Sequence, residues 1–192
     1  MKGVVMKRFF VVVMAVLLGA TMFALAGCSS GDTVKAQQAT QTADAAFAPI
    51  NQQLNTLQTQ STQLITQFMS GQAGTVGTEQ ITAAKNAMDS LVKQLETVKA
   101  DYAKVTTLSG VPDYVAYAKA MEKAIDADIA VINSGAALLQ KLLPAIQAGD
   151  VNALQAAIQA NMGEITAIQT QANNAEKALN QATQIKTSKN LK

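Results

Sequence analysis

Apolar residues recur along the body of this chain with a spacing that leaves few choices of fold. Between Ile81 and Val105 they follow one another at alternating steps of three and four residues without interruption. This period matches one face of an α-helix, and no strand produces it, because strand side chains alternate every second residue. The sequence therefore predicts a long amphipathic helix that begins near Thr78 and ends before Gly110.

Three further stretches, 47–68, 112–146 and 151–182, show the same period. Glycines and prolines separate them, and Gly149 followed by Asp150 is typical of a helix end and a helix start. Four amphipathic helices with short connections favour an all-α fold, an antiparallel up-down-up-down four-helix bundle. A coiled coil between chains stays open as the alternative, because the seam of 151–182 is rich in alanine.

The first thirty residues have a different character. Lys2, Lys7 and Arg8 precede an uncharged apolar run at residues 9–26. A basic start, an apolar run and small residues are typical of an export signal. An uncleaved membrane helix is the alternative, because about 18 apolar residues is close to the shortest span of a bilayer.

The run Leu25-Ala26-Gly27-Cys28 resembles the lipobox of bacterial lipoproteins. This resemblance implies that the Cys28 thiol receives a diacylglyceryl group and that the signal peptide 1–27 is cleaved between Gly27 and Cys28. Acyl chains such as palmitate on Cys28 then anchor the protein to membrane lipid on the extracytoplasmic side of the bacterial cell envelope. The choice between inner and outer membrane stays open.

The residue inventory narrows the chemistry. The chain has no histidine, and Cys28 is its single cysteine. Without histidine, neither a Ser-His-Asp triad nor a Cys-His pair can be built, and a Cys/His zinc site is excluded as well. We therefore expect a protein that is not an enzyme and that carries no metal or cofactor beyond the covalent lipid.

Charge argues against nucleic acid as a partner. Loss of Lys2, Lys7 and Arg8 with the signal reduces the fifteen basic residues to twelve, against thirteen acidic ones. Arg8 is also the single arginine, so the mature chain has no guanidinium to bind phosphate or guanine in bidentate fashion. Faces rich in Gln, Thr, Asn and Ala suit another envelope protein or peptidoglycan better.

Residues 28–46 carry almost no large apolar side chain, which predicts a flexible tether between the acylated cysteine and the bundle. The expected organisation is thus a signal peptide at 1–27, a tether at 28–46 and a bundle with a short C-terminal tail at 47–192. Pro49 lies either in the first turn of the first helix or at a kink in a helix that begins earlier.

Polar residues on apolar seams mark one candidate site. Ser61 and Asn161 interrupt otherwise apolar stripes, and Asp128 adjoins a shift in spacing between Ile125 and Ile129. These residues either form a polar layer that fixes helix register or line a small ligand cavity between helices.

A second candidate site follows from topology. In an up-down bundle the connection near Ser109 and the C-terminus lie at the membrane-near end, where tyrosine and lysine contact lipid headgroups. The alternative is tyrosines at the edge of the core and a solvated tail. The residues of this predicted membrane-near patch are Tyr102, Tyr114, Tyr117, Lys186, Lys189 and Lys192.

From the sequence we expect a membrane-anchored lipoprotein whose helical domain is an envelope binding or scaffolding module. The alternative is a carrier or sensor that binds a small apolar ligand between its helices.

Overall fold

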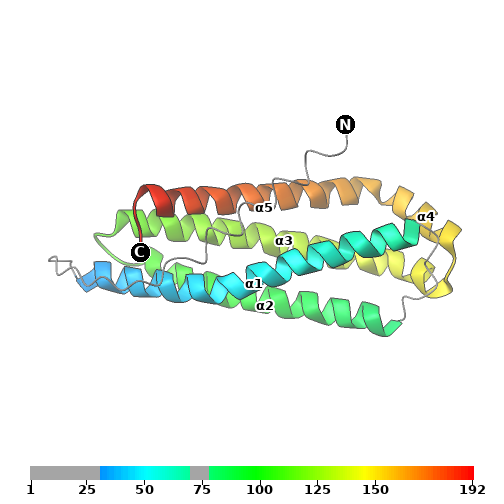
Figure 1. Ribbon diagram of the computed structural model, residues 1–192, viewed down its shortest axis with the longest axis horizontal. Helices are drawn as coiled ribbons and strands as arrows, with labels where there is room; N and C mark the ends of the chain where they lie inside the picture. The colour runs from blue at the N-terminus through cyan, green and yellow to red at the C-terminus, as the bar shows by residue number, and fades with distance from the viewer. Residues whose placement is uncertain (1–30, 70–77) are drawn as a thin grey trace.

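The structure is a computed structural model that describes residues 31–69 and 78–192. This part of the chain folds into α-helices with no strand, so the all-α prediction is confirmed for it. The long helices lie lengthwise beside one another, and the C-terminus lies at the end of the molecule where the first helix begins (Figure 1). The helices are α1 (Gly31–Met69), α2 (Thr78–Thr106), α3 (Pro112–Ala148), α4 (Val151–Ala160) and α5 (Met162–Ser188).

Helix α3 is central, because it contacts each of the other four helices. It runs antiparallel to α5: Asp113 at its start pairs with Lys189 just beyond α5 at 3.2 Å, and Lys141 near its end pairs with Glu164 near the start of α5. Among the described helices, α3 is also the one whose length and composition would allow it to cross a membrane. Only 6% of its most apolar stretch is buried in the structure.

The buried apolar residues form two clusters. The larger one joins α1, α2, α3 and α5 and contains Leu95, Tyr102 and Ile125, none of which has exposed surface. The smaller one, at the other end of the helices, joins Ile81 of α2, Ile146 of α3 and Leu154 of α4. The predicted stripe of α2 and the first half of the stripe of α3 therefore face the interior.

The first helix begins at Gly31, so the prediction of a flexible tether is wrong for residues 31–46. Ala36, Thr40 and Ala43 of this segment are buried and continue the stripe that reaches Phe47. Because these side chains are small, the segment lacks the large apolar residues that mark a stripe in the sequence, yet α1 packs closely through them. Residues 1–30 lie outside the described part.

The helix predicted over 151–182 is two helices. It begins as expected: Gly149 has a positive φ of 63°, and the Asp150 carboxylate accepts from two backbone amides of the first turn of α4. It breaks at Asn161, whose φ of −108° and ψ of 15° are not helical. The side-chain amide of Asn161 donates from Nδ2 to the backbone carbonyl of Ala157 at 2.8 Å. Asparagine side chains compete for backbone groups in this way and favour helix ends.

Candidate functional site

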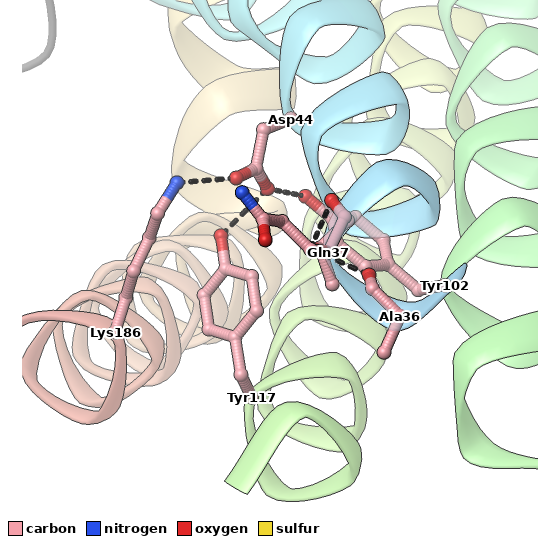
Figure 2. A network of polar contacts seen from close by, with 7 residues as sticks. Ala36, Gln37, Asp44, Tyr102, Tyr117 and Lys186 are labelled. Atoms are coloured by element: carbon pink, nitrogen blue, oxygen red, sulfur yellow. Dashed lines mark hydrogen bonds and ion pairs between the residues drawn. The ribbon is translucent and has the colours of Figure 1, made fainter. Parts of the chain in front are cut away.

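One carboxylate at the edge of the core joins four helices. Asp44 of α1 accepts hydrogen bonds at Oδ1 from the hydroxyls of Tyr102 in α2, at 2.5 Å, and Tyr117 in α3, at 2.6 Å. Its other oxygen, Oδ2, pairs with the ammonium of Lys186 in α5. Figure 2 shows the three donors converging on Asp44. We call these four residues the Asp44 network.

The two tyrosines of the network also contact each other. Their rings meet edge to face with centroids 6.0 Å apart, and the ammonium of Lys186 lies 5.6 Å from the centre of the Tyr117 ring. Tyr102 has no exposed surface and Tyr117 only 5%. Burial raises the pKa of both hydroxyls well above their usual range, and the negative charge of Asp44 raises it further. Both hydroxyls therefore stay protonated at neutral pH and act as donors.

Small residues on α1 place Asp44 against the tyrosines. Asp44 follows Ala43, which is fully buried, and lies one turn after Thr40. The Thr40 hydroxyl donates to the carbonyls of Ala36, at 2.8 Å, and Gln37, at 3.0 Å, so its polarity is satisfied within α1 (Figure 2). The buried side chains of α1 beside Asp44 are thus small and need no partner from other helices. The large side chains of Tyr102 in α2 and Tyr117 in α3 lie opposite them.

The chemistry of the Asp44 network is that of a closed set of hydrogen bonds. Each donor ends on an oxygen of Asp44, and Asp44 receives a donor at both oxygens. A buried polar network in which each group is paired holds elements in one arrangement. The network therefore fixes α1 to α2, α3 and α5.

The predicted membrane-near patch needs correction. Tyr102, Tyr117 and Lys186 do meet, but they meet around Asp44 at the edge of the core, with both tyrosines buried. Tyr114 is 9% exposed, so none of the three tyrosines presents its ring to a membrane surface. Their apolar rings contribute more stabilisation in the core than at the surface. Of the remaining lysines, Lys189 pairs with Asp113 at 3.2 Å, and Lys192 is exposed.

Of the predicted polar site at Ser61, Asp128 and Asn161, the two members whose side chains are described, Asp128 and Asn161, lie apart on α3 and at the α4–α5 junction. Asn161 lies at the junction of α4 and α5, at the level where Lys141 pairs with Glu164. Asp128 lies 13 residues before Lys141 on α3, which corresponds to about 20 Å along a helix. Ser61 lies in α1, and its side chain is outside the described part.

Asp128 is partly buried. Burial raises the pKa of its carboxyl to about 6. Asp126, two residues earlier, is instead exposed and pairs with Lys99 of α2 at 2.5 Å. No lysine of the described residues pairs with Asp128. The Asp128 carboxylate is thus partly shielded from water, and no positive charge compensates it.

Sequence reasoning missed Asp44 and Gln171. Asp44 fell in the segment read as a tether, although the small residues of the stripe through Ala36 and Ala43 were a signal for a helix there. Gln171 of α5 has a buried Oε1 that accepts no hydrogen bond from the described residues. No sequence pattern marks it, because glutamine is equally common on exposed helix faces.

Over residues 31–69 and 78–192, no three His, Cys, Asp or Glu side chains gather closely enough to hold a metal ion. Gly27 and Cys28 lie outside these ranges. Comparisons with known protein families, with curated proteins and with solved structures find no match to this chain.

Proposed function

We propose that this protein is a bacterial lipoprotein, anchored by acylated Cys28 on the extracytoplasmic side of the membrane, with a helical domain that binds or scaffolds other envelope components. The observation that carries the proposal is the run Leu25-Ala26-Gly27-Cys28 directly after a basic start and an apolar stretch. Two or more acyl chains hold a protein on a bilayer stably, whereas a single chain does not.

The start of α1 supports a scaffolding role. Only Ser29 and Ser30 separate Cys28 from the helix that begins at Gly31. An anchor so close to a helix holds the domain at the membrane surface. Because the Asp44 network binds α1 to α2, α3 and α5, the anchor then holds all four long helices.

For the domain itself we propose an antiparallel four-helix arrangement of α1, α2, α3 and α5, with α4 as a short insertion. This arrangement is supported by the extensive contacts of α1 with α2, of α2 with α3 and of α3 with α5. The ion pairs at the two ends of α3 and α5 show that these two helices run antiparallel. A zero-length carbodiimide crosslink between Lys189 and Asp113, detected by mass spectrometry, tests this arrangement, because the lysine ammonium lies 3.2 Å from the carboxylate.

A carrier of a small ligand is the second candidate. It is favoured by a groove of about 340 Å³ between α1 and α2, which lies within the size range of small-molecule sites. Leu57 and Leu91 give this groove an apolar floor, with Gln53, Thr56 and Ser90 beside them. Extra mass on the protein in native mass spectrometry would favour this candidate.

The membrane anchor is tested by the variant Cys28→Ala. We expect the wild type in the membrane fraction, released by detergent and not by high salt, in its processed form. The variant lacks the acylated sulfur and should keep residues 1–27. A variant processed like the wild type would contradict the proposal, and Ser29→Ala serves as the matched control.

A further inference from the structure

The exposed surface of α3 carries charges of both signs between α2 and α5. Asp126 pairs with Lys99 of α2, and this hydrogen bond, with a further contribution from the charge of Glu122, raises the pKa of Lys99. Both carboxylates therefore lie on the side of α3 that faces α2. Lys119 and Lys123 lie next to these carboxylates on the side nearer α5, where they line a groove.

These two lysines line a groove of about 660 Å³ between α3 and α5. The groove contains no acidic side chain, and its polar groups, lysine ammonium, glutamine amide and serine hydroxyl, can all donate hydrogen bonds. Lys119 and Lys123 are exposed and form no ion pair with the described residues. The groove is lined by Lys119, Ala120, Lys123, Gln181, Gln184, Ile185 and Ser188.

A third lysine extends the positive charge along the groove. Lys177 precedes Gln181 by one helical turn, so it lies on the same face of α5. It too is exposed and makes no ion pair with the part of the chain that is described. Lys119 and Lys123 are themselves one turn apart, about 6 Å along the axis. Three ammonium groups therefore follow the groove, while Glu122 and Asp126, each three residues beyond one of the α3 lysines, do not line it.

We infer that the α3–α5 groove binds the phosphate group of an anionic ligand, with Lys119 and Lys123 as its main contacts. A phosphate offers several acceptor oxygens to ammonium and amide donors. The source that fits best is a phospholipid headgroup, an assignment that rests on the proposed membrane anchor. Because the groove runs along the side of the helices, a domain lying with α3 and α5 toward the bilayer brings it to the headgroups.

The test uses the mature protein, purified in an uncharged detergent, and titration calorimetry with soluble short-chain lipids. We expect dihexanoyl-phosphatidylglycerol to bind and the zwitterionic dihexanoyl-phosphatidylcholine not to bind. Affinity should fall as salt is raised from about 20 to 200 mM, because exposed charges are screened. The double variant Lys119→Gln/Lys123→Gln should lose about tenfold in affinity, as expected for two exposed charge pairs.

The matched control is Lys85→Gln/Lys93→Gln, which removes two exposed lysines from α2 and should bind as the wild type does. Equal binding of glycerol phosphate would support the groove and assign it to a free phosphate compound. Unchanged binding by the Lys119/Lys123 variant, or equal binding of both lipids, would overturn the inference. Acylation is determined independently by the mass of the protein, so failure of the groove and failure of the anchor are distinguishable.

Discussion

The hydroxyl of Tyr102 in α2 donates a 2.5 Å hydrogen bond to Asp44 in α1, 58 residues earlier in the chain. Tyr117 and Lys186 bring two more donors to the same carboxylate. A single side chain in the segment nearest the proposed anchor thus contacts each of the other long helices. If the anchor is where we propose, Asp44 links it mechanically to the whole domain.

Replacing Asp44 by alanine should lower the free energy of unfolding by about 2–4 kcal/mol. The substitution leaves two buried hydroxyls and a lysine without their acceptor, and unsatisfied buried groups are costly. Urea unfolding followed by circular dichroism at 222 nm measures the change. Asp126→Ala is the control, because its pair with Lys99 is exposed and should contribute less than about 1 kcal/mol. Equal losses in the two variants would contradict the role of the network.

Tyr102 and Tyr117 should ionise only when the protein unfolds at high pH. Burial raises the pKa of both hydroxyls in the folded state, so the stability they contribute is present below their unfolded pKa near 10 and is lost as the pH rises above it. Absorbance at 295 nm, which reports tyrosinate, should therefore rise together with the loss of helical circular dichroism. Ionisation of all three tyrosines well before unfolding would show that the network is open to water.

Asp128→Asn should stabilise the protein at pH 7.5. The folded pKa of about 6 exceeds the ordinary 3.8, so the folded state binds the proton more tightly. The stability that Asp128 contributes is greatest below about pH 4 and is lost as the pH rises through 6. Two pKa units correspond to at most about 3 kcal/mol. Urea unfolding at pH 4 and 7.5 checks this: the gain from the variant should appear at pH 7.5 and shrink at pH 4.

Ala43→Leu should destabilise the protein by about 1–3 kcal/mol, because Ala43 has no exposed surface and a larger side chain would force α1 away from its neighbours. Ala45→Leu, two residues further on an exposed position of the same helix, is the matched control and should change stability little. Thermal unfolding compares the two. Similar behaviour of both variants would indicate that residues 31–46 are not packed as described.

The sequence predicted those helices that carry large apolar residues. The stripe from Ile81 to Val105, the turn at Gly149 and the cap at Asp150 are local signals, and the structure has each of them. The start of α1 was missed because alanine and threonine can pack a close helix contact without raising hydrophobicity. The break at Asn161 was missed because an asparagine on a seam is compatible with both a polar layer and a helix end.

The candidate site was less predictable than the fold. The spacing around Ile125 and Ile129 marked Asp126 and Asp128 equally and did not select Asp128 as the partly buried one. The Asp44 network could not be found in this way, since its donors lie 58 to 142 residues from Asp44 and meet it only through the packing of four helices. Tyrosine and lysine near one end of a bundle suit either a membrane surface or a core, and the structure selects the core.

Intact-mass spectrometry of the protein extracted from its native membrane tests the central claim most directly. The account predicts a mass equal to residues 28–192 plus the mass of a diacylglyceryl group, with or without a further amide-linked acyl chain on Cys28. A mass equal to the whole chain, with residues 1–27 retained and Cys28 unmodified, would contradict the lipoprotein proposal. That result would leave a helical domain attached through an N-terminal membrane helix.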